Sequence, residues 1–399
     1  MHYCDHNATS PLRPESLAAM THALSVCGNP SSVHANGRAA RAIVEEARER
    51  VAALAGAGKG AQVIFTSGAT EAASLALWGA VEGALDEHAA AAGRKDGPAR
   101  ITRLFVSGIE HACIQATAAR MIEDMPWLKL TVLPVDAQGV LDTEALRVVL
   151  REGKGRTLVA VMAANNETGV IQPLAEISRL TRQAGALLLV DAVPAAGKMA
   201  LDFALCDYMV LSAHKIGGPQ GVGALIVADG APLRPQILGG GQQNGLRAGT
   251  ENLAGIAGFG VAAHTLLGAD GERARLAHLT ERFEAALKKA LPEAVIFGAQ
   301  AERLCSTSNF AVPGIAAETA LIALDMDGVR MSAGSTCSSG KIGASHVLAA
   351  MGVDPALGAS ALRASFGWSS TNEDVQAAVE SLVKMTERNR RLPPTDRAA

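Results

Sequence analysis

The sequence predicts an α/β protein in which a mostly parallel sheet carries helices on both faces, followed by a smaller C-terminal domain of α+β type. Up to about residue 230, short apolar runs alternate with helical patterns, as in parallel sheets. Runs such as 187–190 and 208–211 are apolar throughout, as in strands buried on both faces. Beyond Pro292 the alternation becomes irregular, and 399 residues suit about two domains. We therefore expect a large domain over 14–255, and a small domain over 256–399 associated with an N-terminal arm, 1–13.

Composition argues against several classes of protein. The net charge of −3 gives no reason to expect nucleic acid as a partner. The apolar runs are too short to span a membrane, and the N-terminus lacks the basic and apolar regions of a signal peptide. The six cysteines are scattered without CxxC spacing, which argues against a metal site or a disulfide framework and favours a reducing cytoplasm.

The expected elements follow from the apolar runs and from the glycine and proline positions. Strands are expected at 63–65, 104–106, 131–133, 158–162, 187–190, 208–211 and 223–228. Helices are expected at 35–54, at 173–185 and over 253–290 with a break near 268–271. The polar first residues are expected to form an extended arm.

A lysine and a carboxylate follow two of these strands. Lys215 comes shortly after the run 208–211, and Asp191 directly follows 187–190. Open α/β sheets bind their ligands at the carboxyl ends of the strands. An amine and a carboxylate there are the minimum set for pyridoxal phosphate, because the lysine forms the Schiff base and the acid keeps the pyridine nitrogen protonated. Either residue alone is weak evidence, since a lysine at a strand end is more often a solvated surface group. The hypothesis therefore depends on the pair and on the motifs that follow.

Polar motifs follow three other strands. The stretch 66–71 opens a helix with small residues, which predicts an anion site, although a plain helix start with a threonine cap has the same pattern. Glu110-His111 lies past the next strand, where a histidine could stack on a cofactor ring or be structural. Asn165-Asn166 follows another strand and either lines the crevice or caps a turn. The glycine-rich stretch 239–250 predicts a loop or a linker.

The second chemical centre is Cys337, within the Ser/Gly-rich stretch 332–340. No side chain there can anchor the stretch in a core, so we expect a mobile loop without a stable helix or a packed strand. A free thiol has a pKa of ~8.5, so a small thiolate fraction at neutral pH already makes a usable nucleophile. The alternative is a bystander cysteine. Downstream, Arg363 offers a fork for a substrate carboxylate, or is a surface charge.

These stretches together resemble the cysteine desulfurases of the nitrogen-fixation and iron–sulfur-assembly type, which are class V aminotransferases. The stretches that carry the resemblance are 5–9, 29–32, 67–71, 110–111, 165–169, 212–215, 247–250, 332–340 and 363–365. The resemblance implies fold type I of the pyridoxal-phosphate enzymes, with the cofactor in the large domain and the mobile Cys337 loop in the small one. It also implies conversion of L-cysteine to L-alanine, with the sulfur left as a persulfide on Cys337.

The same resemblance implies a role for each site residue. Lys215 would form the Schiff base, Asp191 would pair with the ring nitrogen, and His111 would stack on the ring and assist proton transfer. The remaining cofactor contacts would come from Ala69, Thr70, Ser212 and His214 at the phosphate and from Asn166 at the ring oxygen or the substrate.

Contacts with substrate and partners are implied in the same way. Arg363 would bind the substrate carboxylate, and Thr250 would reach the phosphate of the other subunit in a homodimer. The persulfide would pass to a sulfur acceptor or an iron–sulfur scaffold protein, where Cys337 could transiently ligate a cluster. One position departs from the family: Pro194 stands where a glutamine usually donates to the ring's phenolic oxygen, and proline has neither a side-chain donor nor an N–H.

Three functions compete at this point. The first is cysteine desulfurase. The second is another enzyme of the same fold, such as a selenocysteine lyase or a small-molecule aminotransferase, although Cys337 in its loop speaks against a plain aminotransferase. The third is a non-catalytic assembly or interaction protein on the same fold, which the presence of both Lys215 and Cys337 disfavours. Release of alanine from cysteine distinguishes them.

Overall fold

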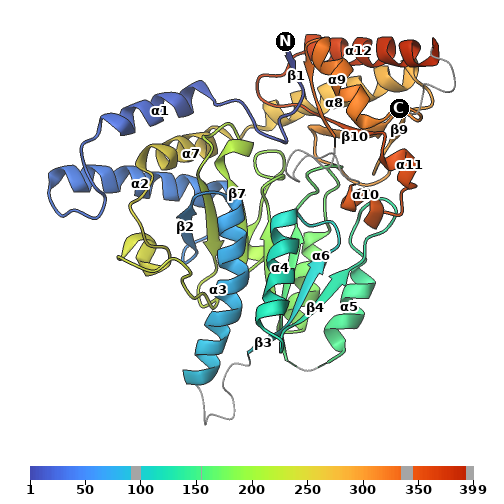
Figure 1. Ribbon diagram of the computed structural model, residues 1–399. Helices are drawn as coiled ribbons and strands as arrows, with labels where there is room; N and C mark the ends of the chain where they lie inside the picture. The colour runs from blue at the N-terminus through green and yellow to red at the C-terminus, as the bar shows by residue number, and fades with distance from the viewer. Residues whose placement is uncertain (91–99, 154, 334–344, 392–399) are drawn as a thin grey trace.

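The computed structural model describes residues 1–90, 100–153, 155–333 and 345–391. A large layered part surrounds a seven-stranded sheet, and a smaller part lies beyond one edge of that sheet (Figure 1). The N-terminus and the last described residues of the chain lie on the smaller part. The predicted fold class, a mostly parallel sheet with helices on both faces and a smaller α+β part, is confirmed.

The large sheet has the strand order β2-β8-β7-β6-β5-β3-β4. Its strands are β2 (Gln62–Thr66), β3 (Ile101–Ser107), β4 (Lys129–Leu133), β5 (Arg156–Met162), β6 (Leu187–Asp191), β7 (Tyr208–Ser212) and β8 (Gly223–Val227). The pairs from β4 through β7 are parallel, and β8 runs antiparallel to both of its neighbours. The carboxyl ends of the other six strands therefore lie along one edge, where open α/β sheets bind ligands.

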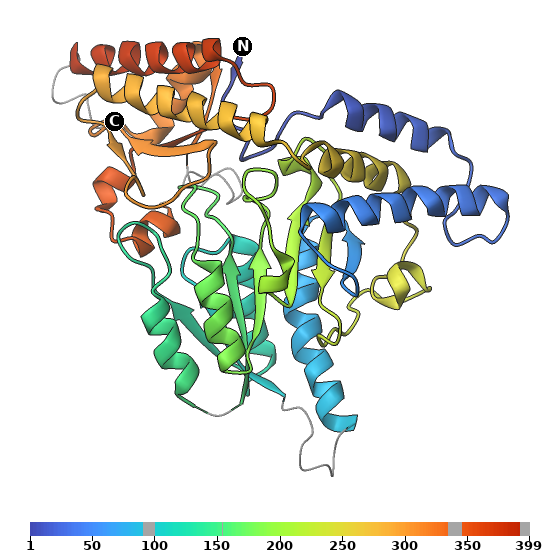
Figure 2. The ribbon, with the colours of Figure 1, turned by 180° about the vertical axis from the view of Figure 1, so that it is seen from behind.

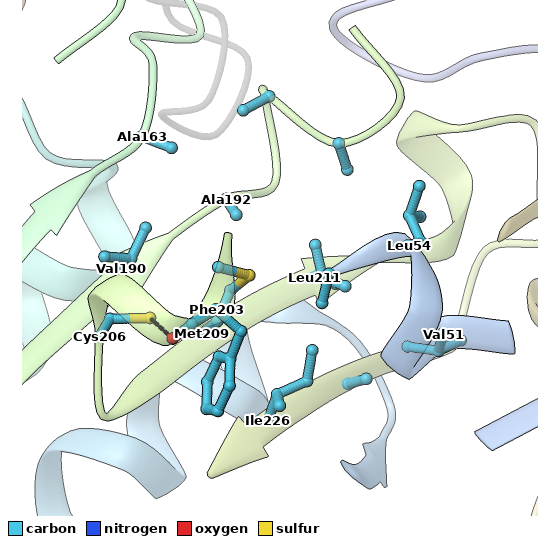
Figure 3. Packing of buried hydrophobic residues seen from close by; sticks show 14 of the residues in the cluster. Val51, Leu54, Ala163, Val190, Ala192, Phe203, Cys206, Met209, Leu211 and Ile226 are labelled. Atoms are coloured by element: carbon cyan, nitrogen blue, oxygen red, sulfur yellow. Dashed lines mark hydrogen bonds between the residues drawn. The ribbon is translucent and has the colours of Figure 1, made fainter. Parts of the chain in front are cut away.

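Alternate residues of each strand enter two different cores, as the period of a strand requires. Leu188 and Val190 of β6 pack against one set of helices, and Leu189 packs against the other. Figure 3 shows part of the first core, where Val51 and Leu54 of helix α2 (Ala35–Leu54) lie near Leu211 and Ile226 of the sheet. Because both faces are covered, the strand sequences are apolar runs without alternation.

Two sets of helices cover the sheet. One face carries α3 (Ala69–Ala90) and α4 (Ala112–Asp124), seen in front of the sheet in Figure 1. The other face, toward the viewer in Figure 2, carries α2 (Ala35–Leu54), α5 (Thr143–Arg151), α6 (Leu174–Gln183) and α7 (Leu253–Thr265). Helix α1 (Pro14–Ser25) packs on α7.

Helix α2 shows why these sequences form helices. Its buried residues recur at Ala40, Val44, Ala47, Val51 and Leu54, the spacing of a single helix face. At its start the His34 side chain accepts from the Gly37 N–H. It ends before Gly56, whose φ of 65° suits a helix C-terminus. The predicted bounds, 35–54, are confirmed.

The smaller part is built on a four-stranded antiparallel sheet of order β12-β13-β10-β9. Its strands are β9 (Val295–Ile296), β10 (Thr307–Ala311), β12 (Ser332–Ala333) and β13 (Ala361–Ser365), and β1 (His2–Tyr3) pairs separately with β11 (Val329–Arg330). Its helices are α8 (Asp270–Ala290), α9 (Ala317–Met326), α10 (His346–Ala350), α11 (Pro355–Gly358) and α12 (Asn372–Arg391).

The helices that follow residue 255 bear on where the two parts divide. Helix α7 buries Ile256 and Phe259 in the core of the large sheet, whereas α8 buries Leu276 and Phe283 in the core of the small part. A division at residue 255 would separate α7 from its own core. We therefore propose that the division falls between α7 and α8.

None of the helices in the described ranges is by itself both long and apolar enough to cross a membrane. Helices α7 and α8 meet that criterion of length and composition only as a pair, and they are bent by 81° at the break between them.

Candidate active site

The carboxyl ends of the large-sheet strands form the floor of a cavity of about 740 Å³. The small part contributes Ser332 and Arg363 to its wall, and the N-terminal arm contributes residues from Asp5 to Thr9. The predicted site residues that line the cavity are Ala69, Thr70, His111, Asn166, Asp191, Ser212, His214, Lys215 and Arg363. The structure thus brings together residues that lie almost 300 positions apart in the sequence.

Lys215 lies in the single turn Ala213–Lys215 that follows β7. Its Nζ donates to the carbonyl oxygen of Ala8 at 2.8 Å and also to that of Asn7. The amine is therefore held at the cavity wall by the backbone of the N-terminal arm.

Asp191 ends β6 and is 5% exposed. Its Oδ1 accepts from the Val193 N–H at 2.9 Å. Burial raises the pKa of its carboxyl, while the Val193 N–H, His111 and Lys215 act in the opposite direction. A buried carboxylate needs a cationic partner, which a protonated pyridine nitrogen provides.

The first turn of α3 faces the same cavity, with Ser67, Gly68, Ala69 and Thr70 in its lining. The first N–H groups of a helix have no partner within the helix, and the helix dipole favours an anion there. The backbone of Gly223 on β8 packs directly against this turn: a Cβ at Gly223 would lie 2.6 Å from the carbonyl carbon of Gly68. The position of the helix start therefore depends on that glycine.

His111 is the N-cap of α4, and its Nδ1 accepts from the Cys113 N–H at 3.2 Å. The proton of the neutral ring is consequently on Nε2. The Cys113 Sγ lies 3.0 Å from the same Nδ1, and Cys113 also lines the cavity. Behind the histidine, the fully buried Glu110 accepts from the Met162 N–H at 2.6 Å. Burial, together with the nearby Asp191 carboxylate, raises the pKa of Glu110 well above its usual range.

Ser212 and His214 come just before Lys215 in the chain and line the same cavity. Ser212 is the buried last residue of β7, and the His214 Nδ1 lies 3.2 Å from Thr9 Oγ1. Burial, with Lys215 beside it, lowers the pKa of His214 to about 4. His214 is therefore neutral at neutral pH and can offer an anion a ring N–H but no full charge.

Arg363 comes from β13, and its side chain is 3% exposed. Its Nη2 donates to Asp5 Oδ1 at 2.8 Å, and its Nη1 donates to the carbonyl oxygen of Asn166 at 3.1 Å. Asp5 Oδ2 in turn accepts from Ser332 Oγ at 2.7 Å. The surface-charge alternative for Arg363 is therefore wrong.

Two further polar residues of the cavity, Asn7 and Lys198, carry no role in the sequence analysis. Lys198 Nζ donates to Asn7 Oδ1 at 2.7 Å, and Asn7 Nδ2 donates to Thr307 Oγ1 at 2.9 Å. Burial and the nearby Lys215 lower the pKa of Lys198 to about 7. Asn7 thus links both amines to the small part. The hydrogen-bond partners of Asn7 are some 200 to 300 positions away in the sequence, so no local pattern could reveal these contacts.

Two predicted residues and one predicted stretch need separate mention. Thr250 is exposed and lines a neighbouring hollow with Arg247 and Glu251, not the main cavity. Cys337 lies outside the described residues. The expectation that 332–340 contains no packed strand is wrong at its start, because Ser332 and Ala333 form β12, pair with β13 and are buried. Pairing with β13 supplies the anchor that their small side chains cannot.

Pro194 is buried and lines the cavity, four residues before Lys198.

Across the ranges that the structure describes, no three His, Cys, Asp or Glu side chains come close enough together to hold a metal ion.

The cavity residues fit pyridoxal phosphate. The open helix start suits a phosphate, since even a Cβ on Gly68 would meet nothing within 4 Å. The buried Asp191 suits the ring nitrogen, and Lys215 supplies an amine in the same cavity.

Comparison with known proteins agrees with this geometry. The family model described as aminotransferase class-V matches residues 2–378. The chain is 36% identical to a cysteine desulfurase IscS of Dictyoglomus turgidum over 98% of this chain and 96% of the relative. It is 38% identical to a cysteine desulfurase of Cereibacter sphaeroides over 98% and 97%. A solved NifS-like protein of Rickettsia africae superposes with a TM-score of 0.85 at 30% identity, covering 97% of this chain and 99% of that one.

The chain belongs to the class V aminotransferase family. Enzymes of this family depend on pyridoxal phosphate, and the cavity described above holds the residues to bind it.

Proposed function

We propose that the protein is a pyridoxal-phosphate-dependent cysteine desulfurase, which converts L-cysteine to L-alanine and keeps the sulfur as a persulfide on Cys337. The observation that carries the proposal is the convergence of Lys215, Asp191 and the start of α3 on one cavity, with Arg363 entering from the small part. The relatives named as cysteine desulfurases support the choice of substrate.

When bound, pyridoxal phosphate supplies an electron sink that labilises the bonds at the substrate Cα. Asp191 would keep the proton on the ring nitrogen, and the first turn of α3 with Ser212 and His214 would hold the phosphate. Lys215 Nζ receives the Cα proton, a transfer that requires the amine to leave the carbonyl groups of Asn7 and Ala8. The N–H of His111 Nε2 would offer the substrate a hydrogen-bond donor.

The sulfur leaves the substrate through Cys337. Its thiolate Sγ attacks the substrate sulfur, an S–S bond forms, and the C–S bond breaks as alanine is released. Arg363 orients the substrate by its carboxylate, and Asn166 lies beside it at the cavity wall. The bound sulfur then passes to an acceptor, such as an iron–sulfur scaffold protein.

We also propose that the enzyme is a cytoplasmic homodimer. The exposed position of Thr250, away from its own cavity, supports a role toward the phosphate site of a partner subunit. Analytical ultracentrifugation tests this point, and a monomer at micromolar concentration would exclude it.

The function is tested by incubating the purified protein with L-cysteine and a reductant and measuring alanine and sulfide. We expect equal amounts of both, with no turnover in Lys215→Ala protein. A large preference for selenocysteine in a parallel assay would indicate a selenocysteine lyase. Absence of alanine from either substrate would favour a non-catalytic assembly protein.

A further inference from the structure

The guanidinium of Arg363, the group proposed to bind the substrate carboxylate, already has a carboxylate partner. Asp5 Oδ1 accepts from Arg363 Nη2 at 2.8 Å, and both side chains line the cavity. Asp5 belongs to the N-terminal arm and Arg363 to β13, so the contact is a tertiary one.

The environment makes this contact strong. The side chains of Arg363 and Asp5 are 3% and 16% exposed, so water screens their attraction little. Asp5 is held on its other side, because its Oδ2 accepts from the buried Ser332 Oγ at 2.7 Å. Arg363 Nε is buried and has no hydrogen-bond partner among the described residues. Asp5 is therefore the carboxylate that neutralises Arg363 in the substrate-free cavity.

A substrate carboxylate that reaches Arg363 meets this arrangement. The two terminal nitrogens of the guanidinium are already engaged, Nη2 with Asp5 and Nη1 with the Asn166 carbonyl oxygen. The arriving carboxylate either displaces Asp5 or binds the remaining N–H groups beside it, and two carboxylates at one guanidinium repel each other. Either route reduces the net affinity for the substrate carboxylate.

We propose that Asp5 is a specificity-determining residue, an internal carboxylate that competes with the substrate carboxylate for Arg363 and so sets how tightly carboxylate ligands bind. This inference rests on the proposed function, because Arg363 must be the carboxylate site. It assigns to the arm a role in weakening ligand binding, which favours release of the product alanine.

The test compares two ligands that differ only in the carboxylate, L-alanine and ethylamine. Their dissociation constants are measured on the full-length, cofactor-loaded protein from the change in visible absorption. The variant is Asp5→Asn, which removes the charge but keeps an acceptor for Arg363, and the Ser332 hydroxyl can rotate to accept from the new amide. We expect L-alanine to bind about tenfold more tightly to Asp5→Asn protein, and ethylamine to change by less than about twofold.

Two controls keep the outcome interpretable. Ser332→Ala removes the other partner of Asp5 without changing the charge, so the ratio of the two dissociation constants should stay within about twofold of the parent's. If Asp5→Asn protein does not fold, Asp5→Ser removes the carboxylate with a smaller side chain and is expected to act in the same direction.

Equal changes for both ligands, or weaker binding of L-alanine alone, would overturn the proposal. Neither measurement requires turnover. A protein that forms no alanine from cysteine would refute the proposed function while the binding comparison remained readable.

Discussion

Substitution of Gly223 by alanine tests where the phosphate binds. Gly223 begins β8 beside the first turn of α3. A Cβ at this position would lie 2.6 Å from the carbonyl carbon of Gly68 and 2.9 Å from the backbone nitrogen of Ala69. Ordinary contact begins at 3.4 Å, so the strand and the helix start must separate by about 0.8 Å, the difference between 3.4 and 2.6 Å.

The size of the effect follows from the cost of overpacking. An extra methyl group against backbone that cannot rotate away costs about 1–3 kcal/mol. A bound phosphate opposes the displacement, so we expect the strain to weaken cofactor binding. At 1.4 kcal/mol per factor of ten, the affinity for pyridoxal phosphate should fall by about 5- to 150-fold. Titration of cofactor-free protein with pyridoxal phosphate, followed by visible absorption, measures it.

The matched control is Gly271→Ala on α8, where a Cβ would meet nothing within 4 Å. That variant should bind the cofactor as the parent does, with equal or greater stability, since alanine favours a helix. If Gly223→Ala protein has the Tm of the parent and an unchanged affinity, the phosphate does not bind at the start of α3.

Three further predictions concern single side chains. Cys337→Ser should still bind L-cysteine but form no protein persulfide, and mass spectrometry that finds the added sulfur on Cys113 or Cys206 would refute the assignment. Pro194→Gln should move the pH midpoint of the bound cofactor's visible absorption by about one pH unit, the equivalent of one hydrogen bond. If the titration curves of the variant and the parent coincide, another group already donates a hydrogen bond to the ring oxygen. Burial lowers the pKa of His6 from 6.5 to about 3. Between these two pH values the unfolded chain therefore binds more protons than the folded chain. The free energy of unfolding consequently falls as the pH falls, by at most about 1.4 kcal/mol per pH unit. Urea unfolding at about pH 5 and pH 7 should show a smaller loss in His6→Asn protein, and an equal loss in both proteins would contradict this account.

The strands and their chemistry were predictable because their signals are local. Apolar runs located β6 and β7, and the polar residues at their ends located Asp191 and Lys215. A sheet edge brings such ends together whatever their separation in the sequence. That is why the floor of the cavity, which the strand ends form, could be inferred without the structure.

The contributions of the arm could not be inferred in this way. Asp5 and Asn7 lie in a short polar stretch whose sequence has no periodicity, and their partners Arg363 and Lys198 come from distant elements. The core that α7 joins could not be inferred either, because its apolar sequence suits both cores. These features depend on tertiary contacts alone.

The central claim, that Lys215 carries the cofactor, is tested most directly by reducing the cofactor-loaded protein with borohydride and mapping the modified peptide. We expect the pyridoxyl group on Lys215 and no covalent link in Lys215→Ala protein, which should still bind pyridoxal phosphate. Lys198 is the informative alternative, because its amine lines the same cavity and its pKa of about 7 leaves much of it neutral. Modification of Lys198, or of any lysine other than Lys215, in the parent protein would contradict the account.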